Sequence, residues 1–137
     1  MGQTIQTAIT RSQQAQSDHD WMVQQMVGAY TLLGHSDIKA GYAGHENGAP
    51  LPLGVHLPDV TALAGAVQIP IICDVETRDT LNNEHTRSQL LTFRSAADKL
   101  GGVLHVGLPF KSDVERAKRV VAGWGILVDQ WWYGVAL

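Results

Sequence analysis

The chain has 137 residues, of which 45% are hydrophobic and 17% charged, and its formal net charge is −3. This length predicts one domain around a single hydrophobic core, and the acidic balance excludes the broadly basic surface of many nucleic-acid binders. Its one cysteine, Cys73, excludes an internal disulfide and favours a reducing, cytoplasmic setting. No apolar run approaches the length of a membrane span, and the polar N-terminus lacks a signal-peptide pattern.

The N-terminal part of the chain predicts a polar arm followed by a helix. Residues 1–17 are rich in Gln and Thr and are expected to form a flexible arm ahead of a single domain over residues 18–137. Ser17 or Asp18 is expected to cap the helix, and Gly34 to end it. The helix is predicted from an apolar stripe with helical period, formed by Met22, Val23, Met26, Val27, Tyr30 and Leu33.

Strands and helices alternate in the rest of the chain. A first helix of this part is expected over residues 84–100, and a second over 112–125 that opens with a capping box of Ser112 and Glu115. An antiparallel meander followed by alternating strands and helices implies an α/β fold, a mixed central sheet flanked by helices on both faces. Its strands are predicted at 38–43, 56–67, 68–77, 101–110 and 126–137.

Three carboxylates fall in the middle of this pattern, within the stretches LPDV and IPIICDVET. Residues two apart on a strand share a face, so Asp74 and Glu76 are expected side by side, about 7 Å apart. Two anions on a half-buried face repel each other and lose hydration, and a divalent cation between them and Asp59 would remove both costs. Oxygen ligands favour Mg²⁺ or Mn²⁺, for which the carbonyl of Val75 is a further ligand.

An isolated Asp-x-Glu pair has a simpler interpretation, because surface acids on a strand can form salt bridges with Arg78 or Arg87. The Pro58-Asp59 pair upstream, at the start of an adjacent strand, favours the metal site instead. Pro-Asp, fourteen residues, and then Asp-Val-Glu at the end of a central strand resembles the PD-(D/E)XK nuclease superfamily. That superfamily includes restriction endonuclease-like enzymes, Holliday junction resolvases and related DNA repair nucleases.

The resemblance extends over about residues 20–133, because the order of elements is similar to the αβββαβ restriction endonuclease-like core of that superfamily. In this resemblance Asp59 matches the acid of the Pro-Asp pair and Asp74 matches the (D/E) position, and both would hold the metal ion. Glu76 stands where most members have lysine, as in small bacterial members that lack it. Some active restriction enzymes also carry glutamate there, so Glu76 is expected to be a metal ligand or a general base.

The resemblance implies a Mg²⁺-dependent DNA endonuclease, a hydrolase of phosphodiester bonds. Gln89, on the helix after the motif, would lie within reach of the scissile phosphate. Arg87 and Arg94 share a face of that helix and would contact the DNA backbone, although a solvated helix surface explains them equally well. The alternative function is a catalytically inactive nuclease-fold module that binds nucleic acid or a protein partner, because a glutamate cannot supply the positive charge of the lysine.

Histidines and tryptophans leave further alternatives open. His56 is out of phase with Asp59 on a regular strand, so a contact with phosphate or water is the less favoured interpretation, and His85 opens the helix near Glu76. The adjacent Trp131 and Trp132 must face opposite sides of the last strand. An exposed aromatic edge strand favours a homodimer, and burial under the helix at 112–124 is an equal alternative.

Overall fold

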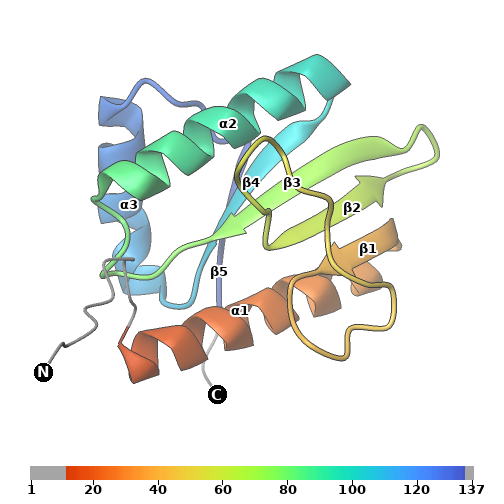
Figure 1. Ribbon diagram of the computed structural model, residues 1–137, viewed down its shortest axis with the longest axis horizontal. Helices are drawn as coiled ribbons and strands as arrows, with labels where there is room; N and C mark the ends of the chain where they lie inside the picture. The colour runs from red at the N-terminus through yellow and green to blue at the C-terminus, as the bar shows by residue number, and fades with distance from the viewer. Residues whose placement is uncertain (1–11, 135–137) are drawn as a thin grey trace, which may run out of the picture.

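Five strands form one mixed sheet in the computed structural model, which describes residues 12–134. The strands lie in the spatial order β1-β2-β3-β4-β5 (Figure 1). The first three pair antiparallel, and β3, β4 and β5 pair parallel, so β3 is the central strand. This confirms the expected α/β fold. The strand bounds are Ser36–Ala40 for β1, Val60–Ala64 for β2, Ile69–Val75 for β3, Val103–Leu108 for β4 and Gln130–Tyr133 for β5.

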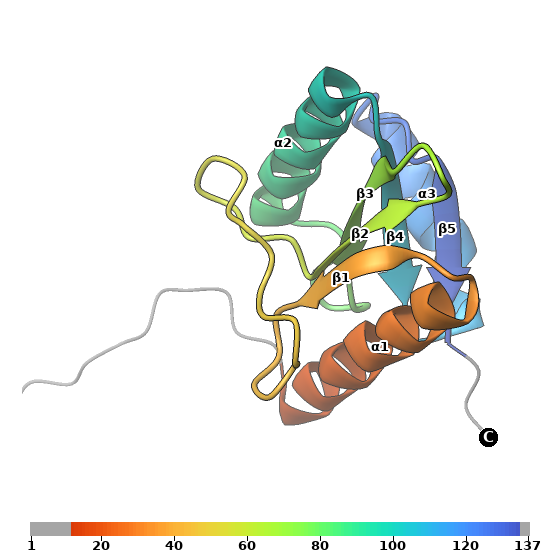
Figure 2. The same cartoon turned by 90° about the vertical axis from the view of Figure 1, so that its right-hand side faces the viewer.

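Helices cover both faces of this sheet, as Figure 2 shows in a view turned by 90°. Helix α1 (Gln13–Leu32) packs on one face. Helices α2 (Glu84–Leu100) and α3 (Val114–Gly123) pack on the other, and a short 3₁₀ turn, η1 (Lys111–Asp113), precedes α3. No helix within residues 12–134 combines the length and the apolar character that a membrane crossing requires.

The alternation of side chains along β3 divides the core into two halves. Ile71, Cys73 and Val75 are buried against α1, whereas Ile72 is buried against α2. This alternation confirms that Cys73 belongs to the core and faces away from Asp74. Because successive side chains of a strand point to opposite faces, the period-two pattern of the sequence was sufficient to predict this division.

The same alternation separates the two adjacent tryptophans of β5. Trp131 packs against the clusters under α2 and α3, and Trp132 packs against the cluster under α1. Both rings therefore have apolar partners within their own chain, and the indole N–H of Trp132 donates to His105 Nδ1 at 3.1 Å. The structure accounts for these side chains without a second chain.

Two of the expected helix caps are wrong. Ser12 caps α1, since its Oγ accepts from the amide of Ala15 at 3.1 Å. Residues 13–17 are consequently helical rather than part of the arm, whose first eleven residues lie outside the described part of the chain. Ser112 lies inside the 3₁₀ turn, and no side chain caps the turn or α3. The 3₁₀ turn occupies the chain where the capping box was expected.

The strands are shorter than the sequence pattern predicts, whereas α2 has the predicted bounds. Strand β2 begins only at Val60, because His56 forms an isolated bridge with Leu53 and the intervening segment is irregular. Residues 135–137 of the last predicted strand lie outside the described part. Apolar alternation continues past the point where a strand loses its pairing partner, so it overestimates strand length.

Candidate functional site

A small pocket of about 160 Å³ lies at the end of β3, between α1 and the start of α2. It contains Asp59, Asp74, Glu76 and Gln89, the side chains for which the sequence predicts a catalytic role. The clustering of the three carboxylates is therefore confirmed. Among the described residues that line it, none is Lys or Arg. The full lining is His19, Asp59, Asp74, Glu76, Thr80, Asn83, His85, Thr86 and Gln89.

Asp74 is the most deeply buried acid of the pocket, with 0% of its surface exposed. Its Oδ1 accepts a hydrogen bond from Gln89 Nε2 at 2.9 Å. No hydrogen-bond donor among the described residues reaches its buried Oδ2, and the carboxyl groups of Glu76 and Asp59 lie close enough to share a proton with Asp74. Burial, together with the charges of Glu76 and Asp59, raises the pKa of Asp74 well above its usual range. The carboxylate form of Asp74 is therefore costly unless a cation joins it.

Asp59 is positioned where the antiparallel pair of β2 and β3 opens. Its backbone amide donates to the carbonyl of Cys73 at 3.1 Å, and its Oδ2 accepts from the amide of Val75 at 2.7 Å. Its Oδ1 lies 3.1 Å from Nε2 of His19, which comes from α1. The carboxylate is thus fixed by both neighbouring elements. Val75, expected as a carbonyl ligand of the metal, does not line the pocket and contributes its amide to Asp59 instead.

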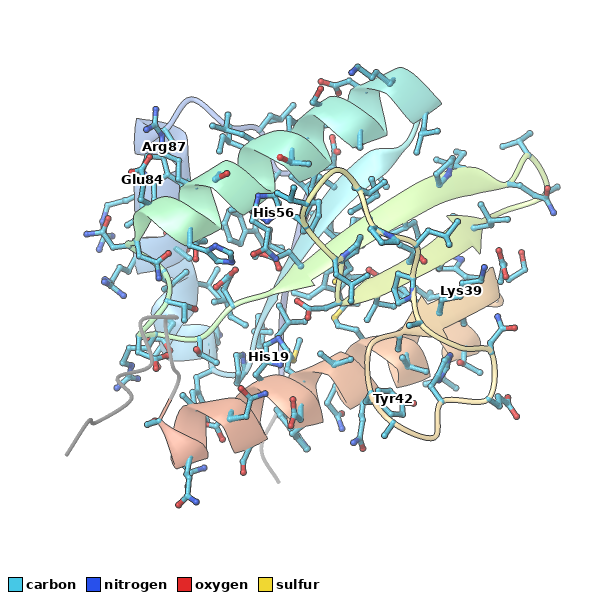
Figure 3. All side chains as sticks on the ribbon, viewed as in Figure 1. His19, Lys39, Tyr42, His56, Glu84 and Arg87 are labelled. Atoms are coloured by element: carbon cyan, nitrogen blue, oxygen red, sulfur yellow. The ribbon has the colours of Figure 1, made fainter. Side chains whose placement is uncertain are left out.

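His19 was not predicted as a site residue. Its second ring nitrogen, Nδ1, lies 3.2 Å from a carboxylate oxygen of Asp20, so both nitrogens face carboxylates. A carboxylate only accepts hydrogen bonds, so a ring that donates to both acids at once must be doubly protonated. Figure 3 shows His19 on the side of α1 that faces the sheet. A protonated His19 would form an ion pair with Asp59 in this geometry.

Glu76 follows directly after β3 and is 2% exposed. Its Oε2 accepts from the hydroxyl of Thr80 at 2.5 Å, whereas the hydroxyl of Thr86 lies 3.4 Å away and donates more closely to the carbonyl of Thr80, at 2.7 Å. Thr86 lies in the first turn of α2, where its amide donates to the capping side chain of Asn83 at 2.8 Å. A hydroxyl donor holds the glutamate oxygen in place and carries no formal charge itself.

The two arginines expected to contact DNA do not reach the pocket. Arg87 pairs with Glu84 on its own helix at 2.9 Å, and Figure 3 shows both on the side of α2 away from the sheet. Arg94 donates to Asp98 and Asp129, each at 2.8 Å, and only 16% of its side chain is exposed. Arg94 therefore ties α2 to the segment before β5, which is a structural role.

Of the two histidines considered earlier, His85 lines the pocket and His56 does not. His56 is 8% exposed, and its Nε2 lies 3.2 Å from the hydroxyl of Ser88. Its ring also packs edge-on against that of His85, with the centroids 5.4 Å apart. His56 thus supports the outer wall of the pocket from behind His85.

The residues that the sequence analysis missed come from outside the two motifs. His19 lies on the same helix face as Met22, Val23 and Met26, at spacings of three, four and seven residues. That apolar stripe predicts that His19 also points toward the sheet, which is a usable signal. Thr80, in the β3–α2 loop, and Thr86, in the first turn of α2, carry no comparable pattern.

The chemistry of the pocket fits a hard divalent cation bound through few protein ligands. Within residues 12–134, no three His, Cys, Asp or Glu side chains are arranged to hold a metal ion together. Mg²⁺, however, commonly takes one or two carboxylates and keeps several waters. The buried Oδ2 of Asp74 and the neighbouring Asp59 provide such a pair. Comparisons with models of protein families, with curated proteins and with solved structures find no match to this chain.

Proposed function

We propose that this chain is a metal-dependent DNA endonuclease that hydrolyses phosphodiester bonds with Mg²⁺ or Mn²⁺ held by Asp59 and Asp74. The observation that carries the proposal is the buried Oδ2 of Asp74, which no hydrogen-bond donor among residues 12–134 reaches and which lies in a pocket with two further carboxylates. A buried charge is normally paired or bound to a metal. The order α1-β1-β2-β3-α2-β4 is consistent with the αβββαβ core of restriction endonuclease-like enzymes.

The side chains of the pocket have distinct roles in this proposal. When bound, a divalent cation supplies charge neutralisation at the phosphate and lowers the pKa of water. Gln89 holds Asp74 in position through Oδ1, which leaves Oδ2 for the cation. Glu76, held by the hydroxyl of Thr80, is in place to accept a proton from the attacking water. When protonated, His19 balances the charge of Asp59.

The test is nicking of supercoiled, linear, single-stranded and branched DNA in Mg²⁺ or Mn²⁺, with EDTA as the control. Asp59→Asn and Asp74→Asn each remove one charged ligand and should abolish cleavage. Asp37→Asn is the matched control, because it makes the same chemical change on an exposed residue of β1 outside the pocket. Cleavage by the Asp74→Asn variant at the wild-type rate would contradict the proposal.

Metal binding should be visible without any DNA. A ligand that binds only the folded chain raises its melting temperature, so Mn²⁺ should stabilise the wild type and the Asp37→Asn control but not Asp74→Asn. A wild-type protein that binds no divalent cation and cuts no DNA would favour the alternative, an inactive nuclease-fold module that binds nucleic acid or a protein partner.

The homodimer remains a prediction, although one of the two reasons for expecting it no longer applies. The tryptophans of β5 pack within their own chain, so they no longer call for an interface. The remaining motive is that an enzyme cutting both strands of a duplex needs two sites, and two-fold symmetry is the default for small oligomers. A monomeric mass by light scattering at high micromolar concentration would exclude the dimer.

A further inference from the structure

A second and larger cavity, of about 610 Å³, adjoins the acidic pocket. Its volume falls within the range of about 300–1,000 Å³ that is usual for ligand pockets. The two hollows have no described lining residue in common, but they are neighbours, because Asp18 of the cavity precedes His19 of the pocket and the amide of Thr77 in the cavity donates to the hydroxyl of Thr80 in the pocket at 3.2 Å. A nucleotide next to a phosphate held in the pocket would therefore lie at the cavity.

Two planar side chains border the cavity. Phe110, between β4 and η1, is 40% exposed although its ring is large and apolar. Arg78, after β3, has a side chain that is 69% exposed, and its Nε is held by Asp113 at 3.2 Å. Nucleic-acid bases stack on aromatic rings and on guanidinium planes. The cavity thus offers two faces suited to an unpaired base.

The charge of the cavity favours a base over a phosphate. The described residues of its lining include three carboxylates, those of Asp18, Asp79 and Asp113, and one positive charge, that of Arg78. These four side chains carry a formal net charge of −2, which disfavours a phosphate. A carboxylate can accept a hydrogen bond from the exocyclic amino group of a base such as cytosine. Thymine has no such group to donate.

We propose that this cavity binds an unpaired base that carries an exocyclic amino group, next to the scissile phosphate. The preferred substrate is then single-stranded DNA, or a single-stranded end or flap, because a base must leave the duplex stack to enter a cavity. The inference rests on the proposed nuclease function for the position of the phosphate. Base binding itself is measurable without cleavage.

The experiment measures binding of fluorescein-labelled oligo(dC), oligo(dT) and a duplex of equal length by anisotropy, in Ca²⁺ and in EDTA. The wild type should bind oligo(dC) more tightly than oligo(dT) or the duplex. Phe110→Ala should weaken oligo(dC) binding about tenfold, as expected for the loss of one stacked base, and Phe110→Tyr should retain it. Tyr133→Ala is the matched control, because Tyr133 is 45% exposed and does not line the cavity.

The outcomes separate this inference from the proposed function. Phe110-dependent binding of oligo(dC) by a protein that cuts nothing would support the base site and contradict the nuclease. Metal-dependent cleavage with unchanged binding in a folded Phe110→Ala variant would support the nuclease and overturn the base site. Equal binding of oligo(dC) and oligo(dT) would also overturn it as stated, as would tighter binding of the duplex.

Discussion

Two polar clusters lie on opposite faces of β3 and β4, and they differ in how their hydrogen bonds are satisfied. On the face under α1, His105 is 6% exposed, and its Nδ1 accepts from the hydroxyl of Tyr30 at 2.7 Å and from Trp132 at 3.1 Å. On the face under α2, Asp74 is 0% exposed, and no hydrogen-bond donor among the described residues reaches its Oδ2.

Under the proposed function, the first cluster serves stability and the second serves catalysis. Burial lowers the pKa of His105 to about 4 and raises that of Tyr30, so both side chains are neutral near pH 7. A neutral and fully bonded cluster stabilises a core. Buried acids that lack a compensating partner destabilise it, and such exceptions to local rules concentrate at functional sites. The predictions below test this division, from the largest expected effect to the smallest.

The largest expected effect is that of Asp74→Asn, which should improve stability while it abolishes activity. Loss of a charged metal ligand should reduce the cleavage rate at least about a thousandfold. Removal of the buried charge should raise the free energy of unfolding in EDTA by about 1–3 kcal/mol above pH 7. The sign follows from the raised pKa of Asp74. A carboxyl group whose pKa is higher in the folded than in the unfolded state lowers the free energy of unfolding as pH rises and the group ionises.

Chemical denaturation in EDTA and a cleavage assay in Mg²⁺ give the two readouts. Asp37→Asn should change neither, because Asp37 is exposed on β1. A variant at position 74 that loses both stability and activity would show that Asp74 is a structural residue, and the contrast between the two clusters would fail.

The next effect concerns Glu76, where most members of the resembled superfamily carry lysine. Glu76→Lys should abolish cleavage and lower stability, because a cation there repels Mg²⁺ and cannot accept a proton, and the hydroxyl of Thr80 would lose its 2.5 Å acceptor. Glu76→Gln is the matched control, since its amide oxygen can still accept from Thr80. It should fold like the wild type and cut about a hundredfold more slowly if the carboxylate is a general base.

Activity that rises in Glu76→Lys would reverse this interpretation. It would mean that the glutamate is an inert replacement in a decayed site, and that lysine restores the missing charge. The cleavage rates of the three proteins in Mg²⁺, measured on the same DNA, distinguish these outcomes.

The sequence alone was sufficient to predict the parts of this comparison that depend on local periodicity. The period of two along β3 separates Asp74 from Cys73, which follows from the geometry of one strand. Gln89 was expected near the pocket from the resemblance to the nuclease superfamily, and its side chain lies there. The bounds of α2 were also predictable, because its Asn83 cap and its αL glycine, Gly101 (φ 67°), are local signals.

Contacts between distant elements could not be predicted in the same way. Arg94 is on the expected helix face, but its partner Asp129 comes from the segment before β5. His19 meets Asp59 only because α1 packs against the end of the sheet. Such pairs depend on tertiary packing rather than on spacing along the chain. The lack of a hydrogen-bond donor at Asp74 Oδ2 among the described residues is likewise a property of the folded structure alone.

The cluster under α1 should make the protein sensitive to acid. His105 has a pKa of about 4 in the folded chain, below the value of about 6.5 expected when it is unfolded. The unfolded state therefore binds more protons between these values, and stability falls as pH decreases through this window, by up to about 3 kcal/mol. The groups that act on His105 besides burial are Asp129, which raises its pKa, and His35, which lowers it.

Urea denaturation at pH 7, 6, 5 and 4 checks this expectation. A His105→Gln variant should lose less stability over this range than the wild type, because it has no imidazole to protonate. An equal pH dependence in both proteins would show that other groups cause the acid sensitivity.

The smallest expected effect is that of Tyr30→Phe, which removes one donor from the satisfied cluster. His105 Nδ1 would keep the indole N–H of Trp132 as a partner, so no buried acceptor is left unbonded. The loss should be about 1 kcal/mol in the free energy of unfolding, the net value of one hydrogen bond. Cleavage should be unchanged, because neither Tyr30 nor His105 lines the acidic pocket.

Adding Trp132→Phe to Tyr30→Phe leaves Nδ1 of His105 without either donor. The double variant should therefore lose more stability than the two single losses together. Additive losses would mean that the two donors act independently, and a large fall in cleavage with Tyr30→Phe would connect the two clusters that the structure separates.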